Sequence, residues 1–167
     1  MKSPFAIAVW MVLASVLLKM IVFVNGWQFN DYGRVAFFGN VFILMIGVYL
    51  SLRLYKRTIG GVTTFFDDFR AAMRFVGLYA ILMTAFVYIY YAQIDTAYFD
   101  TKLKDQLTLA AEHEMDLEQV KKTGEMVFTP FFQSTVTLMG FLILGSFYSA
   151  IITFLTRKTR AYGEKKV

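Results

Sequence analysis

Four long apolar runs constrain the fold of this chain more than any other feature. They cover about residues 5–24, 35–52, 71–91 and 131–155. A bilayer core of about 30 Å needs about 20 helical residues at about 1.5 Å each, and every run is close to that length. The runs are apolar around most of the helix, whereas a surface helix shows a polar face. They predict an all-α, polytopic membrane protein built as a bundle of four transmembrane helices.

The composition agrees with four spans and narrows the function. Of the 167 residues, 57% are hydrophobic and 18% are aromatic, whereas a soluble domain has about 45–50% apolar residues. The net charge is +5, but the basic residues flank the apolar runs, so we expect no nucleic acid partner. The chain has no cysteine, which excludes disulfides, Cys-ligated zinc and a thiol nucleophile. We expect a single membrane domain over residues 1–167. We expect its first run to be retained as a span, because "VFVNGW" offers no signal-peptide cleavage site.

Lysine and arginine are distributed unequally between the two sides of the predicted spans. One side carries eleven of them: Lys2, Arg53, Lys56, Arg57, Arg70, Arg74, Arg157, Lys158, Arg160, Lys165 and Lys166. The other side carries five over a longer stretch of chain: Arg34, Lys102, Lys104, Lys121 and Lys122. Because cytoplasmic loops are enriched in Lys and Arg, we predict that both termini are cytoplasmic. Trp27 and the cluster Tyr88, Tyr90 and Tyr91 are then expected at the outer interface, where amphipathic rings settle.

The stretch GGVTTFFDDFR, residues 60–70, separates the second and third runs. Gly60 and Gly61 are predicted to end the second helix. Thr64 is predicted to cap a new helix, with Asp67 in its first turn, where the helix dipole favours a carboxylate. The phenylalanines of this stretch are expected to lie against the membrane interface: Phe65, Phe66 and Phe69.

The adjacent aspartates of this stretch also raise a chemical question. A phosphate-binding loop of the type G-x-x-x-x-G-K-[ST] is not present, because no lysine follows the glycines. Asp67 and Asp68 point about 100° apart on a helix, so they converge poorly on a metal ion. We therefore interpret the stretch as a structural start of the third span, with Asp68 and Arg70 facing water.

The connection 92–129 is the only sizeable part outside the predicted spans. It holds eight acidic and four basic residues. Two helices are predicted, one over about 95–111 and one that starts at Asp116, with Gln119 completing a capping-box pattern. Gly124 and Pro130 are expected to interrupt the path into the fourth span. The pattern predicts an extramembrane helical hairpin between spans three and four, which is a lid, a docking surface or a passive cap.

Two ionisable residues, Lys19 and His113, are candidates for a functional role. Lys19 lies inside the first span, about 8 Å from its outer end at the helical rise, so its stem can reach the interface. Snorkelling, a pair with Asp31 or Asp95, and contact with a phosphate or lipid headgroup remain open for it. His113 lies near Glu112 and Asp116 in sequence but is turned away from both on a helix, which favours a solvated histidine over a zinc ligand.

Small residues mark a packing face on the fourth span. Gly145 and Ser149, like Ser146 and Ala150, are four residues apart, a spacing that lets helices approach closely. We expect these four residues to pack against neighbouring helices, with glycines of the second and third spans facing them: Gly39, Gly47 and Gly77.

Two segments resemble a known family. The start GGVTTFFDDF of the third span and residues 88–132 carry the likeness. In the second segment a Tyr-rich span end, an "ID" step, an acidic helix, an "MDLEQ" turn and a span opening at Pro follow one another. They resemble domain of unknown function 4199, a family of small four-span membrane proteins common in Bacteroidota. The likeness covers roughly 35–155. It implies the bacterial inner membrane and brings no catalytic residue with it.

The sequence predicts no catalytic, cofactor-binding or metal-ligating residue, because it contains no nucleophile–base pair, metal motif or cofactor loop. We expect a non-catalytic accessory or scaffold subunit, in contact with membrane lipids and with a membrane protein partner or further copies of itself. The family resemblance suggests a glycosyltransferase that uses polyprenyl phosphate as that partner. A small oligomeric transporter or channel is the alternative, although no broken helix or charged ring supports a pore.

Overall fold

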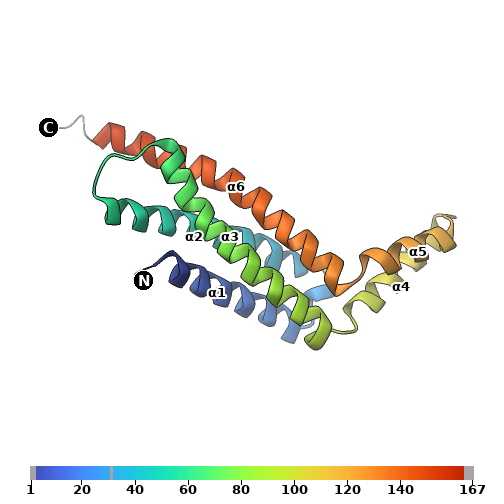
Figure 1. The fold of residues 1–167 in the computed structure, drawn as a ribbon. Coiled ribbons are helices and arrows are strands. Elements are labelled where there is room, and N and C mark those ends of the chain that lie inside the picture. The colour runs from blue at the N-terminus through green and yellow to red at the C-terminus, as the bar shows by residue number, and fades with distance from the viewer. Residues whose placement is uncertain (1–2, 31, 164–167) are drawn as a thin grey trace. The chain divides into compact units, whose positions relative to one another are not determined.

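The computed structural model describes residues 3–30 and 32–163 of the chain (Figure 1). Every regular element in these ranges is helical. In chain order they are α1 (Pro4–Val24), the 3₁₀ turn η1 (Trp27–Phe29), α2 (Gly33–Ile59), α3 (Phe65–Ile89), the π-helical turn η2 (Tyr90–Ile94), α4 (Tyr98–Glu112), α5 (Leu117–Val127) and α6 (Pro130–Gly163).

Four helical segments are long and apolar enough to cross a membrane, as the four runs predict: Pro4–Val24, Gly33–Ile59, Phe65–Ile94 and Pro130–Arg157. The all-α fold with four spans, and with α4 and α5 between spans three and four, is confirmed. The helical boundaries extend beyond the apolar runs. In particular, the third helix begins at Phe65 and therefore includes both aspartates of the stretch 60–70.

The chain divides into two compact units, and the boundaries fall within α3 and α6. The first unit comprises residues 1–82 and 140–167. In it, the start of α1, the connection 60–64 and the late part of α6 lie at the same end (Figure 1). Its core is formed by large side chains that are almost fully buried: Val22, Leu44, Val48, Leu52, Phe75, Val76 and Tyr79.

Hydrogen bonding and ring packing complete the core of the first unit. The Ser15 and Tyr79 hydroxyls lie 2.7 Å apart in a buried hydrogen bond between α1 and α3. The Tyr79 ring also meets Phe141 of α6 edge to face, with 5.1 Å between ring centroids. Aromatic pairs of this geometry are favoured by the ring quadrupole, so Tyr79 links three helices.

The second unit comprises residues 83–139 and contains the α4–α5 hairpin. Helix α4 ends in a Schellman arrangement, because the Met115 N–H donates to the Ala110 carbonyl and the Glu114 N–H to the Ala111 carbonyl. Glu114 adopts φ 52° there, a left-handed conformation that glycine normally provides. The Asp116 carboxylate then caps α5 by accepting from the N–H groups of Glu118 and Gln119.

Gly124 does not interrupt the chain as the sequence predicts, since α5 continues through it to Val127. A Cβ at this position would collide with the Leu103 side chain of α4. The glycine is therefore a point of close helix approach, and that prediction was wrong.

Candidate functional site

Helix α2 ends where a glycine permits a left-handed turn. Gly60 has φ 65°, and its N–H donates to the Lys56 carbonyl at 3.2 Å. A residue with a Cβ is strained in this conformation. The turn reverses the chain directly after the last turn of α2, so Lys56 faces the start of the next helix.

Helix α3 begins with a reciprocal capping arrangement between Thr64 and Asp67. The Asp67 N–H donates to Thr64 Oγ1 at 3.2 Å, and the Thr64 N–H donates to Asp67 Oδ2 at 3.0 Å. Thr64 Oγ1 also donates to Asp67 Oδ2 at 2.7 Å. Two backbone donors that lack a partner in the helix are thus satisfied, which is the physical role of a capping box.

Asp68 is buried, and the prediction that it faces water was wrong. Its exposed fraction is 0%. Lys56 Nζ lies 3.1 Å and Arg157 Nη1 lies 3.3 Å from Asp68 Oδ2, while Thr63 Oγ1 donates to Oδ1 at 2.8 Å. A buried carboxylate is tolerated only with such compensation. We call these four residues, Lys56, Thr63, Asp68 and Arg157, the Asp68 cluster.

The start of α3 at Phe65 explains why Asp68 turns inward. On a helix that begins there, Asp68 shares one face with Ala72, Phe75 and Tyr79, at spacings of four, three and four residues. All three are fully buried. The predicted cap at Thr64 already starts the helix at this position, but the apolar periodicity was not continued back by one turn, which would have placed Asp68 on the buried face. Arg70 is exposed, as predicted.

Arg157 is the member of the cluster that lies farthest from the others in the sequence. Besides its ion pair, Arg157 Nη1 donates to the Thr63 carbonyl at 2.8 Å. The cluster therefore joins the last turns of α2, the connection 60–64, the first turn of α3 and the late part of α6. Lys56 and Arg157 keep 19% and 38% of their side chains exposed, so solvent reaches both cations but not the carboxylate. The cluster holds two positive charges against one negative charge.

Two buried hydroxyls lie on the same face of α6 as Arg157. Ser149 and Thr153 precede Arg157 by eight and four residues and are both 0% exposed. Among the described residues, neither hydroxyl has a hydrogen-bond partner. Gly145, four residues before Ser149, is buried too, and a Cβ there would collide with Val76 of α3. Ser146 and Ala150 are half-buried, and Ser146 Oγ donates to the Leu142 carbonyl at 2.7 Å.

Two of the three glycines expected to face α6 lie against other helices. A Cβ at Gly39 would collide with Leu18 of α1, and one at Gly47 with Phe75 of α3. Gly77 has open space where a Cβ would lie. The expectation that these glycines pack on α6 was therefore wrong. A Cβ added at Gly61 would make only ordinary van der Waals contacts, with Ile59.

A second buried polar group lies in the second unit. The Tyr90 hydroxyl donates to Asp95 Oδ2 at 2.9 Å across the π-helical turn η2. Tyr90 is 1% and Tyr91 8% exposed, and the rings of Tyr98 and Phe99 pack on Tyr91. The turn directs both rings inward, and the location of these tyrosines at the outer interface stays a prediction.

Burial also affects the phenol of Tyr98, which lies in α4 outside the spans. Desolvation raises its pKa above the ordinary value. Tyr88, the third tyrosine of that sequence cluster, is exposed.

The remaining predicted residues that the structure describes lie in different elements. Lys19 is half-buried on α1, and Asp31 lies outside the described residues. Trp27 is half-buried in η1, with its ring 5.6 Å from that of Tyr32. His113 is exposed at the end of α4. Within the described ranges, no three His, Asp or Glu side chains are arranged to hold a metal ion.

Comparison with protein families gives one match. The family model described as protein of unknown function (DUF4199) matches residues 5–158. The chain belongs to the DUF4199 family. The match extends beyond residues 35–155, where the sequence motifs carry the likeness, and includes the first span. No curated protein and no solved structure matches the chain.

All four residues of the Asp68 cluster lie within the part of the chain that matches DUF4199. In this DUF4199 chain the cluster has a single carboxylate, and that carboxylate is engaged by two cations and a hydroxyl. The arrangement can hold the ends of several helices together. It also leaves the exposed parts of Lys56 and Arg157 at the surface.

Proposed function

We propose that this multi-span membrane protein is a non-catalytic accessory or scaffold subunit that binds a protein partner through the α4–α5 hairpin. The carrying observation is the set of apolar side chains exposed on this hairpin: Leu109, Met115, Leu117 and Met126. The hairpin lies between the candidate spans that end at Ile94 and begin at Pro130. Because the hairpin lies outside these candidate spans, a protein partner is the cover that we propose for these side chains.

The hairpin also offers a groove. A pocket of about 290 Å³ lies along α4 and α5, and its lining includes Gln106, Met115, Val120, Thr123 and Val127. Besides apolar residues, the lining includes the amide of Gln106 and the hydroxyl of Thr123, which can donate or accept hydrogen bonds. An apolar centre with polar groups at its edge is the usual anatomy of a protein interface.

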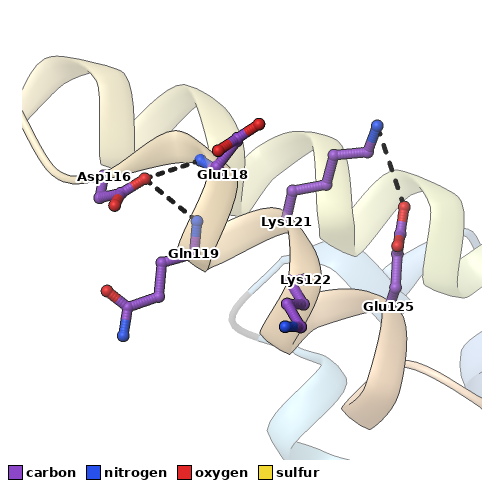
Figure 2. A pocket seen from close by; sticks show the side chains of 6 residues that line it. All are labelled: Asp116, Glu118, Gln119, Lys121, Lys122 and Glu125. Atoms are coloured by element: carbon purple, nitrogen blue, oxygen red, sulfur yellow. Dashed lines mark hydrogen bonds and ion pairs between the residues drawn. The ribbon is translucent and has the colours of Figure 1, made fainter.

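The solvent-exposed face of α5 carries charges of both signs around a shallow pocket, which is lined by Asp116, Glu118, Gln119, Lys121, Lys122 and Glu125. Figure 2 shows Asp116 bonded to the start of the helix, and Lys121 beside Glu125. The Lys121–Glu125 pair is 4.0 Å long and both side chains are more than half exposed. Such a pair contributes little to stability. These charges are therefore available to orient a partner, since charge complementarity governs encounter and register.

The Asp68 cluster supports a structural role for the first unit. Its buried carboxylate is engaged by residues of the chain itself, and reactive groups activated for catalysis usually keep an open position for substrate. For the partner, the family resemblance suggests a glycosyltransferase that uses polyprenyl phosphate. The proposed location is the bacterial inner membrane, with both termini in the cytoplasm.

The orientation is tested with single cysteines, which this chain otherwise lacks. Ser3→Cys and Glu118→Cys are treated with an impermeant thiol reagent in cells whose outer membrane has been made permeable. We expect labelling at position 118 and protection at position 3, because the basic residues collect on the side of the N-terminus. The opposite pattern contradicts the orientation.

Partner binding is tested by purification in mild detergent from the native membrane, with identification of whatever co-elutes. We expect a stoichiometric membrane enzyme that is lost in Met115→Glu and retained in Thr108→Glu. The second variant adds the same charge to an exposed position of α4 outside the groove. Ion or solute flux from the protein alone in liposomes, without a partner, would instead support a channel. Equal recovery of the partner with both variants would exclude the groove.

A further inference from the structure

A small groove lies on the first unit, between the start of α1 and the last turns of α2. Its volume is about 140 Å³, and its lining residues are Ile7, Leu50, Arg53, Leu54 and Arg57. Three of these side chains are aliphatic and two are guanidinium groups. The groove is therefore amphiphilic, with apolar and cationic parts next to each other.

The two arginines lie on one face of α2, because they are four residues apart. Both are exposed. Within the described part of the chain, no carboxylate pairs with either of them. Lys56, which lies between them in the sequence, is directed to Asp68 at 3.1 Å. The last turns of α2 thus direct Lys56 toward the Asp68 cluster, while Arg53 and Arg57 line the groove.

The depth of these side chains along the candidate span matches the depth of lipid headgroups and upper acyl chains in a bilayer. The candidate span ends at Ile59, so Arg53 and Arg57 lie about 9 Å and about 3 Å before its end at the helical rise. This is the level of lipid headgroups, since a bilayer of about 40–45 Å includes interfacial layers outside its apolar core of about 30 Å. Leu50 lies about one helical turn deeper than Leu54, and Ile7 lines the groove from α1. The apolar part of the groove is therefore at the level of the upper acyl chains.

We propose that this groove binds an anionic glycerophospholipid, with the lipid phosphate on Arg53 and Arg57 and the upper part of an acyl chain along Ile7, Leu50 and Leu54. A guanidinium group presents parallel N–H donors that match phosphate oxygens. Two guanidinium groups favour a headgroup with net negative charge over a zwitterionic one, whose own cation is repelled. Basic pockets next to transmembrane helices recognise anionic headgroups by this combination.

This site is independent of the partner proposed for the α4–α5 hairpin, because its lining residues all belong to the first unit. It also differs from the Asp68 cluster, with which it has no residue in common.

The test measures lipid binding to the purified, delipidated full chain by native mass spectrometry, with the melting temperature as a second readout. Phosphatidylglycerol, phosphatidylcholine with the same acyl chains, and inorganic phosphate are the three probes. We expect phosphatidylglycerol to bind at least tenfold more tightly than phosphatidylcholine and to raise the melting temperature, because a ligand that binds the folded state stabilises it. Inorganic phosphate, which lacks the acyl chain, should give no comparable shift.

Four variants separate the parts of the site. Arg53→Gln with Arg57→Gln should bring phosphatidylglycerol binding down to the level of phosphatidylcholine, and Arg57→Gln alone should give an intermediate loss. Leu54→Trp, which fills the groove without changing charge, should weaken both lipids. Arg74→Gln is the matched control, since Arg74 is an exposed arginine of α3 outside the groove.

Two outcomes overturn the proposal. One is unchanged preference for phosphatidylglycerol in the double arginine variant or in Arg57→Gln, should the double variant not fold. The other is inorganic phosphate competing as well as the lipid does, which would mean that the groove takes a free anion rather than a phospholipid.

Discussion

Asp68→Asn tests the Asp68 cluster most directly, because it removes the charge and nearly preserves the shape. At 3.1 Å and 3.3 Å from Lys56 and Arg157, each pair is worth about 5 kcal/mol of gross attraction at an effective dielectric constant of about 20. Desolvation of the buried carboxylate opposes this by several kcal/mol. Losing one partner of a buried pair typically costs about 3–5 kcal/mol. Since both cations are partly exposed and can be rehydrated, we expect a loss of about 2–4 kcal/mol.

The assay is reversible unfolding of the purified protein in detergent, followed by circular dichroism. Asp67→Asn is the matched control, because it changes the neighbouring carboxylate, which caps α3 instead of pairing with Lys56. We expect a smaller loss for that variant, because asparagine keeps an oxygen that can accept from the Thr64 N–H. A double-mutant cycle of Asp68→Asn with Arg157→Gln should give a coupling energy of about 0.5–3 kcal/mol, as for residues within one network.

The salt dependence provides a further check on the same variants. Buried pairs are screened much less than exposed ones, so the loss in Asp68→Asn should persist when the salt concentration is raised. If Asp68→Asn remains within about 0.5 kcal/mol of the unmodified chain, the range of an ordinary surface substitution, the burial and pairing of Asp68 do not hold the helices together, and the reasoning is refuted.

Substitutions at four further positions test the helix packing and the turn that ends α4. Gly145→Ala should destabilise the bundle by about 1–3 kcal/mol, because the added Cβ collides with Val76. Gly140→Ala should instead stabilise it by about 0.5–1 kcal/mol, because a Cβ at position 140 meets open space. Equal unfolding midpoints for the two variants would contradict this prediction. Glu114→Gly should protect the α4–α5 hairpin from hydrogen exchange more than the native residue does, and Glu114→Val less, since φ is 52° there; the reverse order would exclude the left-handed turn. Thr153→Val should leave stability unchanged or raise it, because the hydroxyl has no partner among the described residues; a loss above about 1 kcal/mol would show that it has one.

The spans could be predicted from the sequence because length and continuous apolarity are local properties. The cap at Asp116 could be predicted for the same reason, since its carboxylate accepts from N–H groups only two and three residues further along the chain. The inward direction of Asp68 depended on a partner 89 residues away in the chain, Arg157. A single sequence shows which residues share a helix face, but it does not show which face meets the other helices.

The burial of Tyr90 and Tyr91 at the end of the third span could not be predicted for a related reason. An α-helix continued past Ile89 would have kept the register of α3, but the π-helical turn Tyr90–Ile94 changes it. Such a turn adds a residue to the helical cycle and often marks a functional position. Here it carries Tyr90 to Asp95 and buries Tyr91 against Tyr98 and Phe99. No residue type in this stretch distinguishes a π-helical turn from an α-helical one.

The last turns of α2 show how one basic segment serves two physical roles. Arg53, Lys56 and Arg57 contribute equally to a count of positive charges, yet Lys56 is paired with Asp68 while the two arginines line a separate groove. Pairing with a buried carboxylate fixes helix positions, whereas guanidinium groups at headgroup depth attract anionic lipid. The two roles respond differently to substitution: Asp68→Asn should lower stability without changing the preference for anionic lipid, and loss of Arg53 and Arg57 should abolish that preference in a protein of nearly unchanged stability. A variant set in which both properties always change together would mean that the segment acts as a single site.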